Sequence, residues 1–454
     1  MSGPHSLFVF RRDLRLEDNT GLIQAFESGS KVILLFIVDR NLTKYWKTSE
    51  RRQGFFFQSV VRLEKALSLA GASLLIREGE PSREIGKLLA QYKIETVFLN
   101  REDTPYGLAR DKKIIDTCRD FGADVRICAD DHLTPPGLVV KDDGSPYTVF
   151  TPYYKKALKF SIPFPRKATL ETAAVISGPK ARDFEGVIDW CSVKTAGYEL
   201  DFDESEEILS RLRNMQDYRD SRDIPARDGT SRLSAFLRFG IVSPRQVFHF
   251  FDDDEAELAE LIRRQLFWRD FYKQIALNFP HVYQKSFRTQ YDSISWTNDR
   301  ELFKLWKIGE TGFPIVDAGM RELNQTGFMH NRVRMITASF LVKNLHVDWR
   351  AGAKYFAEKL IDYDPAVNNG NWQWAASTGC DAQPYFRIFN PWRQQKNFDP
   401  DCIYIKRWVP ELVTSSPKEI HALETGEGKY LKKIINLRET AEQTKLMFKQ
   451  ASQK

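Results

Sequence analysis

Short apolar runs alternate with polar stretches through the first third of the chain. The apolar runs occupy residues 7–10, 32–38, 73–77, 96–100 and 125–129. Between them, two polar stretches, residues 58–69 and 82–92, carry apolar side chains at helical spacing. Strands that alternate with helices in this way are typical of a mainly parallel sheet. The pattern therefore predicts an α/β domain over residues 1–132.

The pattern changes in the rest of the chain. Residues 133–215 are rich in turn-forming Pro, Gly and Asp, which predicts a long interdomain connector. Its apolar side chains, such as Phe150, indicate that it packs over the surface of the protein. Helical periodicity dominates afterwards, for example over residues 331–345, and residues 427–454 have the composition of a charged terminal helix. We therefore predict an all-α domain over residues 216–454, and α/β plus all-α as the fold class.

Composition excludes several classes of protein. The 454 residues are 42 % apolar and 28 % charged, a balance typical of globular domains. The net charge of +6 is too small over this length to prove a polyanionic partner. Five cysteines without C-x-x-C spacing indicate neither a disulfide framework nor a zinc site, so we expect no metal and a reducing compartment. No segment has the pattern of a signal peptide or membrane span, so we expect a soluble protein without a membrane partner, cytoplasmic or, in a eukaryote, nuclear.

The aromatic content is high, with 32 Phe, 16 Tyr and 10 Trp making 13 % of the chain. So many ring surfaces indicate either a bulky planar ligand or a dense core. A parallel sheet is a frequent scaffold for nucleotide-like ligands, but G-x-G-x-x-G is absent after the first predicted strand. The dinucleotide-binding fingerprint therefore fails here.

One predicted helix, residues 262–275, carries a polar and aromatic stripe. Helical spacing places Gln265, Trp268, Arg269 and Tyr272 on one face. An amide, an indole, a guanidinium and a phenol together can stack on flat rings and bond to their edges. The alternative is an amphipathic helix whose aromatic rings lie in the core.

Further candidate residues occur in polar segments of the helical half. Residues 362–374 combine acidic, amide and tryptophan side chains, which either address a ligand or cap and fill a helix. Asn331 and Met335 are neighbours at i, i+4, and His330 beside them is expected to be a hydrogen-bonded structural residue. Residues 229–234 open a helix with hydroxyls suited to phosphate oxygens, or to capping alone.

Taken together and in order, these motifs resemble those of the photolyase/cryptochrome family. The similar segments are residues 8–19 (FVFRRDLRLEDN), 228–234 (DGTSRLS), 243–246 (SPRQ), 268–272 (WRDFY) and 368–389. The resemblance covers residues 6–412. Within the family, the chain is similar to the class I cyclobutane pyrimidine dimer (CPD) photolyases.

This resemblance implies a fold and cofactors. The family has an N-terminal Rossmann-like parallel α/β domain, a long connector and a C-terminal helical domain that holds FAD. By similarity, the cofactor-binding residues are Tyr218, Thr230, Ser231, Arg232, Leu233, Ser234, Arg334, Asp362, Asp364 and Asn368. Asn368 would face flavin N5 and stabilise the reduced ring. The presence and identity of a second, antenna chromophore (folate, deazaflavin or flavin) stay open, because Thr104-Pro105-Tyr106-Gly107 replaces the Asn-Glu pair of the folate-binding members.

The resemblance also implies light-driven repair of damaged DNA, single- or double-stranded, by electron transfer from excited reduced FAD to a flipped-out dimer. The residues implied to act on the dimer are Gln265, Trp268, Asn331, Met335, Asn368 and Trp374. An electron-transfer chain would run through Trp372, Trp349 and Trp296. The implied DNA contacts are Gln265, Trp268, Arg269, Tyr272, Asn331, Arg332, Trp374 and Gln394.

One position departs from the class I pattern and keeps alternatives open. Gln265 stands where that class has Glu, as in the (6-4) photolyases, although the (6-4) class has a His pair at the positions of Asn331 and Met335. An amide still accepts from a thymine N3–H and donates to a carbonyl, but supplies no proton. A (6-4) photolyase and a cryptochrome-type photoreceptor are the alternatives to CPD repair. Among the possible functions, a flavoprotein of unrelated redox chemistry is the least favoured. For the oligomeric state, we expect a monomer.

Overall fold

The computed structural model describes residues 4–42, 49–176, 178–183, 205–215, 217–227, 229–251, 256–426 and 428–453. Two compact units divide the chain. Unit 1 comprises Met1–Asn214 and Arg232–Leu277, and unit 2 comprises Met215–Ser231 and Asn278–Lys454. Each unit is described by itself.

Unit 1 contains a parallel five-stranded sheet with the order β3-β2-β1-β4-β5. The strands are β1 (His5–Phe10), β2 (Lys31–Val38), β3 (Leu74–Glu78), β4 (Ile94–Asn100) and β5 (Asp124–Cys128). All five predicted strands are therefore present. In register, Leu7 of β1 pairs with Ile33 of β2 and Val97 of β4. The central strands are apolar on both faces because helices cover both faces.

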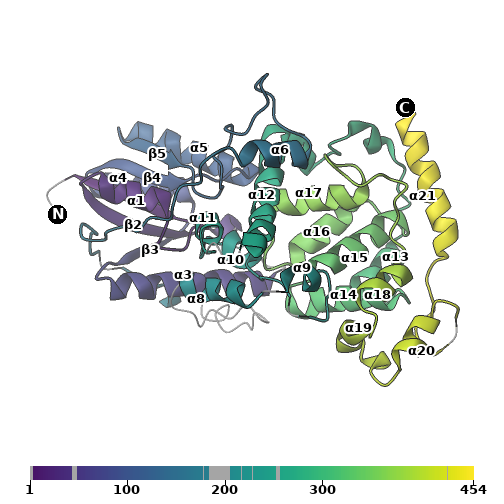
Figure 1. Cartoon of the computed structure of the whole chain (residues 1–454). Helices are drawn as coiled ribbons and strands as arrows, with labels where there is room; N and C mark the ends of the chain where they lie inside the picture. Colours follow the sequence, from purple (N-terminus) through teal and green to yellow (C-terminus); the bar gives the residue numbers. More distant parts are fainter. Residues whose placement is uncertain are drawn as a thin grey trace. The chain divides into compact units, whose positions relative to one another are not determined.

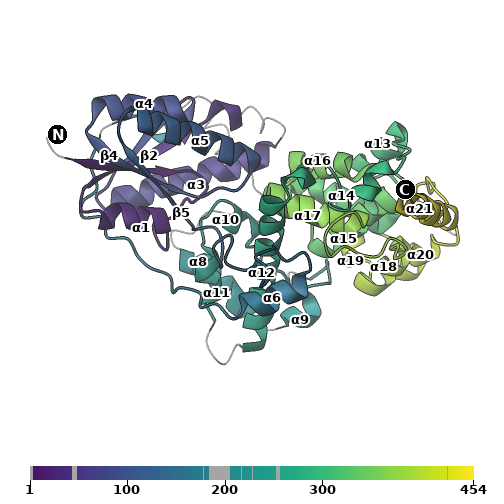
Figure 2. The same cartoon turned by 90° about the horizontal axis from the view of Figure 1, so that it is seen from above.

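Helices α4 and α5 cover one face of the sheet, and α1 and α3 lie on the other (Figures 1 and 2). Ile85 of α4 and Ile114 of α5 share a core with Leu7 and Leu35 of the strands. The α-helices of unit 1 are α1 (Thr20–Glu27), α3 (Glu50–Leu69), α4 (Pro81–Gln91), α5 (Pro105–Asp120), α6 (Phe150–Ala157), α8 (Ser205–Ser210), α10 (Ser234–Arg238), α11 (Pro244–Phe248) and α12 (Ala256–Asn278). These observations confirm the predicted α/β architecture.

The described residues of unit 2 form helices joined by loops, with no strand among them. Its α-helices are α9 (Tyr218–Ser221), α13 (Arg300–Ile308), α14 (Pro314–Thr326), α15 (Asn331–Lys343), α16 (Trp349–Lys359), α17 (Pro365–Ala376), α18 (Pro391–Phe398), α19 (Ile403–Trp408), α20 (Pro417–Ala422) and α21 (Leu437–Ser452). The buried helix α15 packs against α14, α16, α17, α18 and α21. Its side chains Val333, Phe340 and Leu341 belong to one large core that includes Trp306 and Trp372.

Some boundaries differ from those predicted. The helical segment at residues 232–277 packs with unit 1, whereas a helical domain from residue 216 was expected. Part of the predicted connector, residues 184–204, lies outside the described residues. The terminal helix begins at Leu437, ten residues later than expected, because Gly426 and Gly428 have positive φ and Asn436 caps the helix. None of the described helices is long and apolar enough to cross a membrane.

Candidate functional site

The predicted polar and aromatic stripe lies on α12 in unit 1. Gln265 is exposed, Trp268 and Arg269 are half-buried, and Tyr272 is buried. The Trp268 ring stacks on Phe150 of α6, with centroids 3.7 Å apart and an interplanar angle of 8°. One face of the indole is therefore covered, and a stacking ligand has to use the other face.

Arg269 and its neighbour Lys273 are engaged inside unit 1. Arg269 donates to the Asp131 carbonyl at 2.7 Å and to its carboxylate, which Lys273 also contacts. Burial disfavours the charged form of the Asp131 carboxyl group. The positive charges of Arg269 and Lys273 outweigh this effect and hold the pKa of Asp131 well below its usual value. The DNA contacts implied for Arg269 and Tyr272 stay predictions; in unit 1 Arg269 is paired with Asp131 and Tyr272 is buried.

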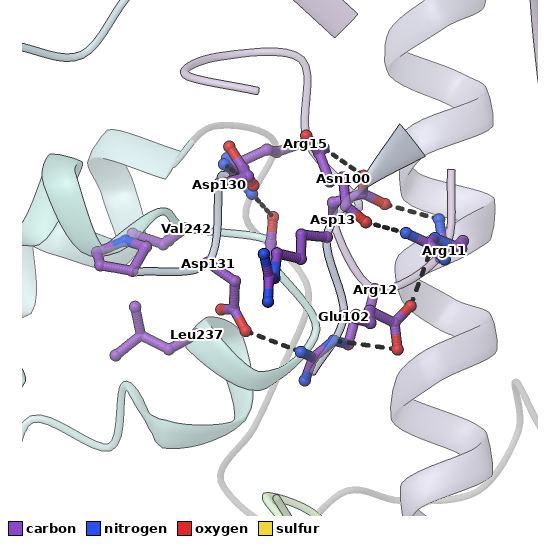
Figure 3. Close-up of a pocket in the computed structure, with 13 residues that line it drawn as sticks. Arg11, Arg12, Asp13, Arg15, Asn100, Glu102, Asp130, Asp131, Leu237 and Val242 are labelled. Carbon is purple, nitrogen blue, oxygen red and sulfur yellow. Dashed lines mark hydrogen bonds and ion pairs between the residues drawn. The ribbon is translucent and has the colours of Figure 1, made fainter. Parts of the chain in front are cut away.

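A small charged cavity lies at the carboxyl ends of β1 and β4 (Figure 3). Parallel sheets commonly bind ligands at this point, where the strand order reverses. Here Arg12 pairs with Asp131 at 2.9 Å and with Glu102 at 3.4 Å, and Arg15 pairs with Asp130 at 2.6 Å. The remaining volume is about 10 Å³, room for about one water molecule. Ion pairs of the chain itself therefore occupy this end of the sheet.

Unit 2 pairs Arg334 with Asp362, two of the residues that the resemblance implies for the cofactor. The guanidinium Nη2 lies 2.9 Å from Asp362 Oδ2 and Nη1 lies 3.3 Å from Oδ1, while Nε donates to the Met329 carbonyl at 2.7 Å. The Arg334 side chain keeps 24 % of its surface exposed, whereas that of Asp362 keeps 5 %. A bidentate pair of this kind fixes both groups in orientation.

Helix α17 positions Asp364, Asn368, Trp372 and Trp374. The Asp364 carboxylate caps the helix by accepting from Ala366 N at 3.0 Å and Val367 N at 3.2 Å. The Asn368 Nδ2 donates to the Ala353 carbonyl at 3.2 Å, so its amide orientation is set. Trp372 is buried, and Trp374 is half-buried. Both tryptophans belong to or pack against the same core of unit 2.

Helix α15 begins with the next group of candidates. Asn331 is exposed, and its Nδ2 lies 3.9 Å from the sulfur of Met335, as the i, i+4 spacing predicts. Arg332 pairs with Asp223 at 2.9 Å and lies over the Phe398 ring at 4.2 Å. His330 is the N-cap: its Nδ1 accepts from Arg332 N at 3.2 Å, and burial lowers its pKa to about 4. The structural role expected of His330 is confirmed.

The remaining candidates of unit 2 stand on different elements. Trp349 is buried at the start of α16, and half-buried Trp296 contacts the Phe448 ring, with centroids 6.2 Å apart. Gln394 is half-buried on α18. Tyr218 is buried on α9, where burial raises the pKa of its phenol.

The segment with the predicted phosphate ligands is divided between the units. Thr230 and Ser231 belong to unit 2, whereas Arg232, Leu233 and Ser234 belong to unit 1. Helix α10 begins at Ser234, as predicted for a helix start after this turn. Arg232 has φ = 50°, a left-handed conformation that the sequence did not signal. Asp228, part of the same motif, lies outside the described residues.

Sequence reasoning missed Phe150 as a partner of Trp268 and Phe398 as a partner of Arg332. Both partners are remote in sequence and stand in segments without a distinguishing pattern. Gly352 was also missed: a Cβ there would lie 2.2 Å from the Trp372 ring, so the absence of a side chain makes room for this tryptophan. Only a spatial neighbour distinguishes this glycine from any other.

Comparison with known proteins agrees with these features. A family described as "FAD binding domain of DNA photolyase" matches residues 262–450, and one described as "DNA photolyase" matches residues 6–170. The deoxyribodipyrimidine photo-lyase of Alkalihalophilus pseudofirmus is 39 % identical over 89 % of this chain and 86 % of its own length.

Solved structures are similar over nearly the whole chain. An archaeal photolyase from Sulfolobus tokodaii with two FAD molecules has a TM-score of 0.87 and 37 % identity, covering 98 % of this chain and 100 % of its own. A bacterial class III photolyase from Agrobacterium tumefaciens has a TM-score of 0.88 and 33 % identity, covering 100 % of this chain and 98 % of its own. The chain belongs to the photolyase/cryptochrome family.

Proposed function

We propose that this protein is a deoxyribodipyrimidine photo-lyase, which uses light to split cyclobutane pyrimidine dimers in DNA. The observation that carries the proposal is the 39 % identity to a photo-lyase of that name over 89 % of the chain. The adjacent Asn331 and Met335 side chains support the CPD lesion over the (6-4) lesion, whose photolyases have histidines at these positions. We further propose the class I subtype on the motifs of the sequence.

The side chains of unit 2 fit one edge of a flavin ring. The Arg334 guanidinium, held by Asp362, supplies N–H donors, and the Asp362 carboxylate supplies acceptors. Asn368 has its amide nitrogen engaged by Ala353, which leaves Oδ1 to accept a ring N–H. A ring edge with alternating N–H and C=O groups needs this mixture. We propose that these residues hold the FAD isoalloxazine, and that Tyr218, Thr230 and Ser231 of the same unit contact its phosphates.

The bound flavin supplies light-driven electron donation to the dimer and recovers the electron, without net redox change. The protein binds, orients and shields the lesion. We propose that Trp268 stacks on the flipped-out dimer with the face not covered by Phe150. Trp374, Asn331 and Met335 of unit 2 also contact the dimer, because a thioether adapts to an irregular apolar lesion. Arg332 and Gln394 bind the DNA strand, and Trp372, Trp349 and Trp296 carry electrons from the surface to the flavin.

Gln265 is the residue by which this protein departs from the class I pattern. Its exposed amide can accept from a pyrimidine N3–H and donate to a carbonyl, but it has no proton to give. We therefore expect dimer binding to be retained and the quantum yield of repair to be lower than that of a Gln265→Glu variant.

We propose that any antenna chromophore bound by the α/β domain is not a folate. Thr104 caps α5 by accepting from Gly107 N at 3.0 Å, and the Tyr106 hydroxyl donates to Asp39. These side chains are engaged in local structure and replace the amide and carboxylate with which other family members bind folate. We propose a deazaflavin or a flavin as the antenna.

The decisive experiment exposes the reduced, FAD-loaded protein to two oligonucleotides, one with a thymine cyclobutane dimer and one with a (6-4) lesion. Blue-light-dependent loss of the cyclobutane dimer alone, absent in a dark control, is the expected result. Loss of only the (6-4) lesion overturns the substrate assignment. If neither lesion is lost while the flavin is photoreduced normally, the photoreceptor function replaces the repair function.

A further inference from the structure

Unit 2 contains a large cavity that is not lined by any of the residues proposed to bind flavin or DNA. Its volume is about 910 Å³, within the range of roughly 300–1,000 Å³ typical of small-molecule sites. It lies among the starts of α14, α18 and α21, the end of α15 and the segment before α21. Apolar side chains form much of its wall: Phe313, Phe389, Trp392, Ile434, Ile435 and Leu437. This wall can hold a flat apolar ring.

The cavity is electropositive. Phe313, Asn390 and Asn436, the N-caps of α14, α18 and α21, all line it, so the positive ends of these helix dipoles meet there. Lys432 and Arg438 add positive charges at the rim, and Arg438 also lies 3.9 Å from Glu442, which is itself exposed.

Two further charged groups line the cavity, and each has partners. Lys433 Nζ donates to the Glu424 carbonyl at 3.0 Å and to the Leu423 carbonyl at 3.5 Å. The Glu424 carboxylate pairs with Lys396 at 2.6 Å, which offsets its negative charge. Attraction of an anion therefore depends mainly on Lys432 and Arg438, because these two are exposed.

A buried acceptor without a partner is also part of the wall. Asn344 is 2 % exposed and lines the cavity, and its Oδ1 has no hydrogen-bond partner among the described residues. Its Nδ2 donates to Thr440 Oγ1 at 3.2 Å, while that hydroxyl donates to the Asn436 carbonyl at 3.1 Å. These contacts set the orientation of the amide, so the group left over is an acceptor. A buried acceptor without a donor is costly, and a ligand N–H at this point removes the cost.

We propose that this cavity binds a mononucleotide. Its phosphate lies at the rim near Lys432 and Arg438, its base lies against the apolar wall, and an exocyclic N–H of the base donates to Asn344 Oδ1. A planar base that carries both an anion and an N–H donor matches every one of these features. The proposal is independent of the repair function, because none of the residues proposed for flavin or DNA lines the cavity.

The test is equilibrium dialysis of the FAD-loaded protein in the dark against AMP and, separately, against adenosine. We expect one AMP site per chain in addition to the flavin, no flavin release, and at least tenfold weaker binding of adenosine. Lys432→Glu and Arg438→Glu should each weaken AMP binding at least tenfold by reversing a charge at the rim. Lys445→Glu is the control, because it makes the same charge change at an exposed position of α21 outside the cavity.

A second variant tests the cavity without changing charge. Ala441→Trp places a large ring in the space that Ala441 borders and should abolish AMP binding, with circular dichroism and thermal unfolding reporting on the fold. Equal affinity for AMP and adenosine, or equal loss in Lys445→Glu, overturns the proposal. So does AMP uptake that is matched by flavin release. A Lys432→Glu variant that weakens binding of DNA but leaves AMP binding unchanged overturns it in favour of a nucleic-acid contact.

Discussion

At the scale of single residues, burial changes the chemistry of charged side chains in this protein. Lys343, at the end of α15, donates from Nζ to Ser377 Oγ at 2.7 Å and to the Tyr385 carbonyl at 3.3 Å, and it lies 4.2 Å from the centre of the Phe448 ring. Burial lowers the pKa of Lys343 to about 7. Neutral acceptors and a ring face offset only part of the cost of removing an ammonium group from water.

This pKa predicts a rise in stability with pH. Between pH 7 and 10.5 the unfolded chain keeps the Lys343 proton and the folded protein does not, so the free energy of unfolding should increase by up to about 1.4 kcal/mol per pH unit. Below pH 7 both states hold the proton and this contribution is flat. The Lys343→Met variant should lack the slope in urea titrations between pH 7 and 10. The control is Lys445→Met, which replaces an exposed lysine on α21 and should keep the slope of the wild-type protein. If Lys343→Met shows the same slope as the wild type, Lys343 is not the group that titrates.

Space is the other constraint on single residues. Gly352→Ala should destabilise the protein by about 1–3 kcal/mol, because the new methyl group would lie 2.2 Å from Trp372 and 2.5 Å from Leu341. Gly86→Ala is the matched control in another helix, where the nearest atom is at 3.3 Å, and it should be neutral or slightly stabilising. Chemical denaturation measures both variants. A smaller loss for Gly352→Ala than for Gly86→Ala would contradict this account.

At the scale of elements, ion pairs connect the carboxyl edge of the sheet with helices of unit 1. Glu102, after β4, lies among Arg11, Arg12 and Arg110. Burial disfavours its charged form, but Arg110 and the other arginines outweigh it and hold the pKa of Glu102 below the usual range. The pairs hold the loops after β1 and β4 in place, whereas an open α/β sheet would have its ligand crevice there.

Removing one partner of this network leaves buried positive charge uncompensated. Glu102→Gln should therefore destabilise unit 1 by about 3 kcal/mol. The control is Glu95→Gln on β4, where the carboxylate is 54 % exposed and its pair with Lys93, at 3.7 Å, contributes little. Thermal unfolding at pH 7 compares the two variants.

Acid provides the second measurement for Glu102. A carboxylate whose folded pKa is depressed stabilises the protein above its unfolded pKa and loses that contribution as the pH falls through the folded value. The difference between wild type and Glu102→Gln should therefore be full at pH 7 and shrink below about pH 4.5. A difference that is constant from pH 7 to pH 3 would show that Glu102 acts through packing alone.

At the scale of the whole molecule, a net charge of +6 over 454 residues does not by itself identify a DNA-binding protein. Binding has to depend on the positions of individual cations. Arg332 is such a position, since it is half-buried, paired with Asp223 and held over the Phe398 ring. A cation held in this way is preorganised for a phosphate group.

Arg332→Ala should weaken binding to dimer-containing DNA and reduce the slope of log affinity against log salt by about 0.9. Arg300→Ala, at an exposed position at the start of α13, removes the same charge and should change neither quantity. Fluorescence anisotropy over a salt series measures both. An unchanged slope in Arg332→Ala would remove this residue from the DNA contact.

The sequence by itself determined the alternation of strands and helices, the positions of all five strands and the helical nature of unit 2. These depend on local periodicity, which reflects which face of each element is buried. The neighbours Asn331 and Met335 were predictable for the same reason, because helical geometry alone brings i and i+4 together.

Only the tertiary structure decided which side chains meet across long stretches of chain. Arg269 bonds to Asp131, Trp268 stacks on Phe150 and Arg334 pairs with Asp362, and no periodic pattern relates the members of these pairs. The cavity at the starts of α14, α18 and α21 is likewise a product of packing. Periodicity records whether a residue is buried, but not which residue buries it, because the partner depends on the path of the whole chain.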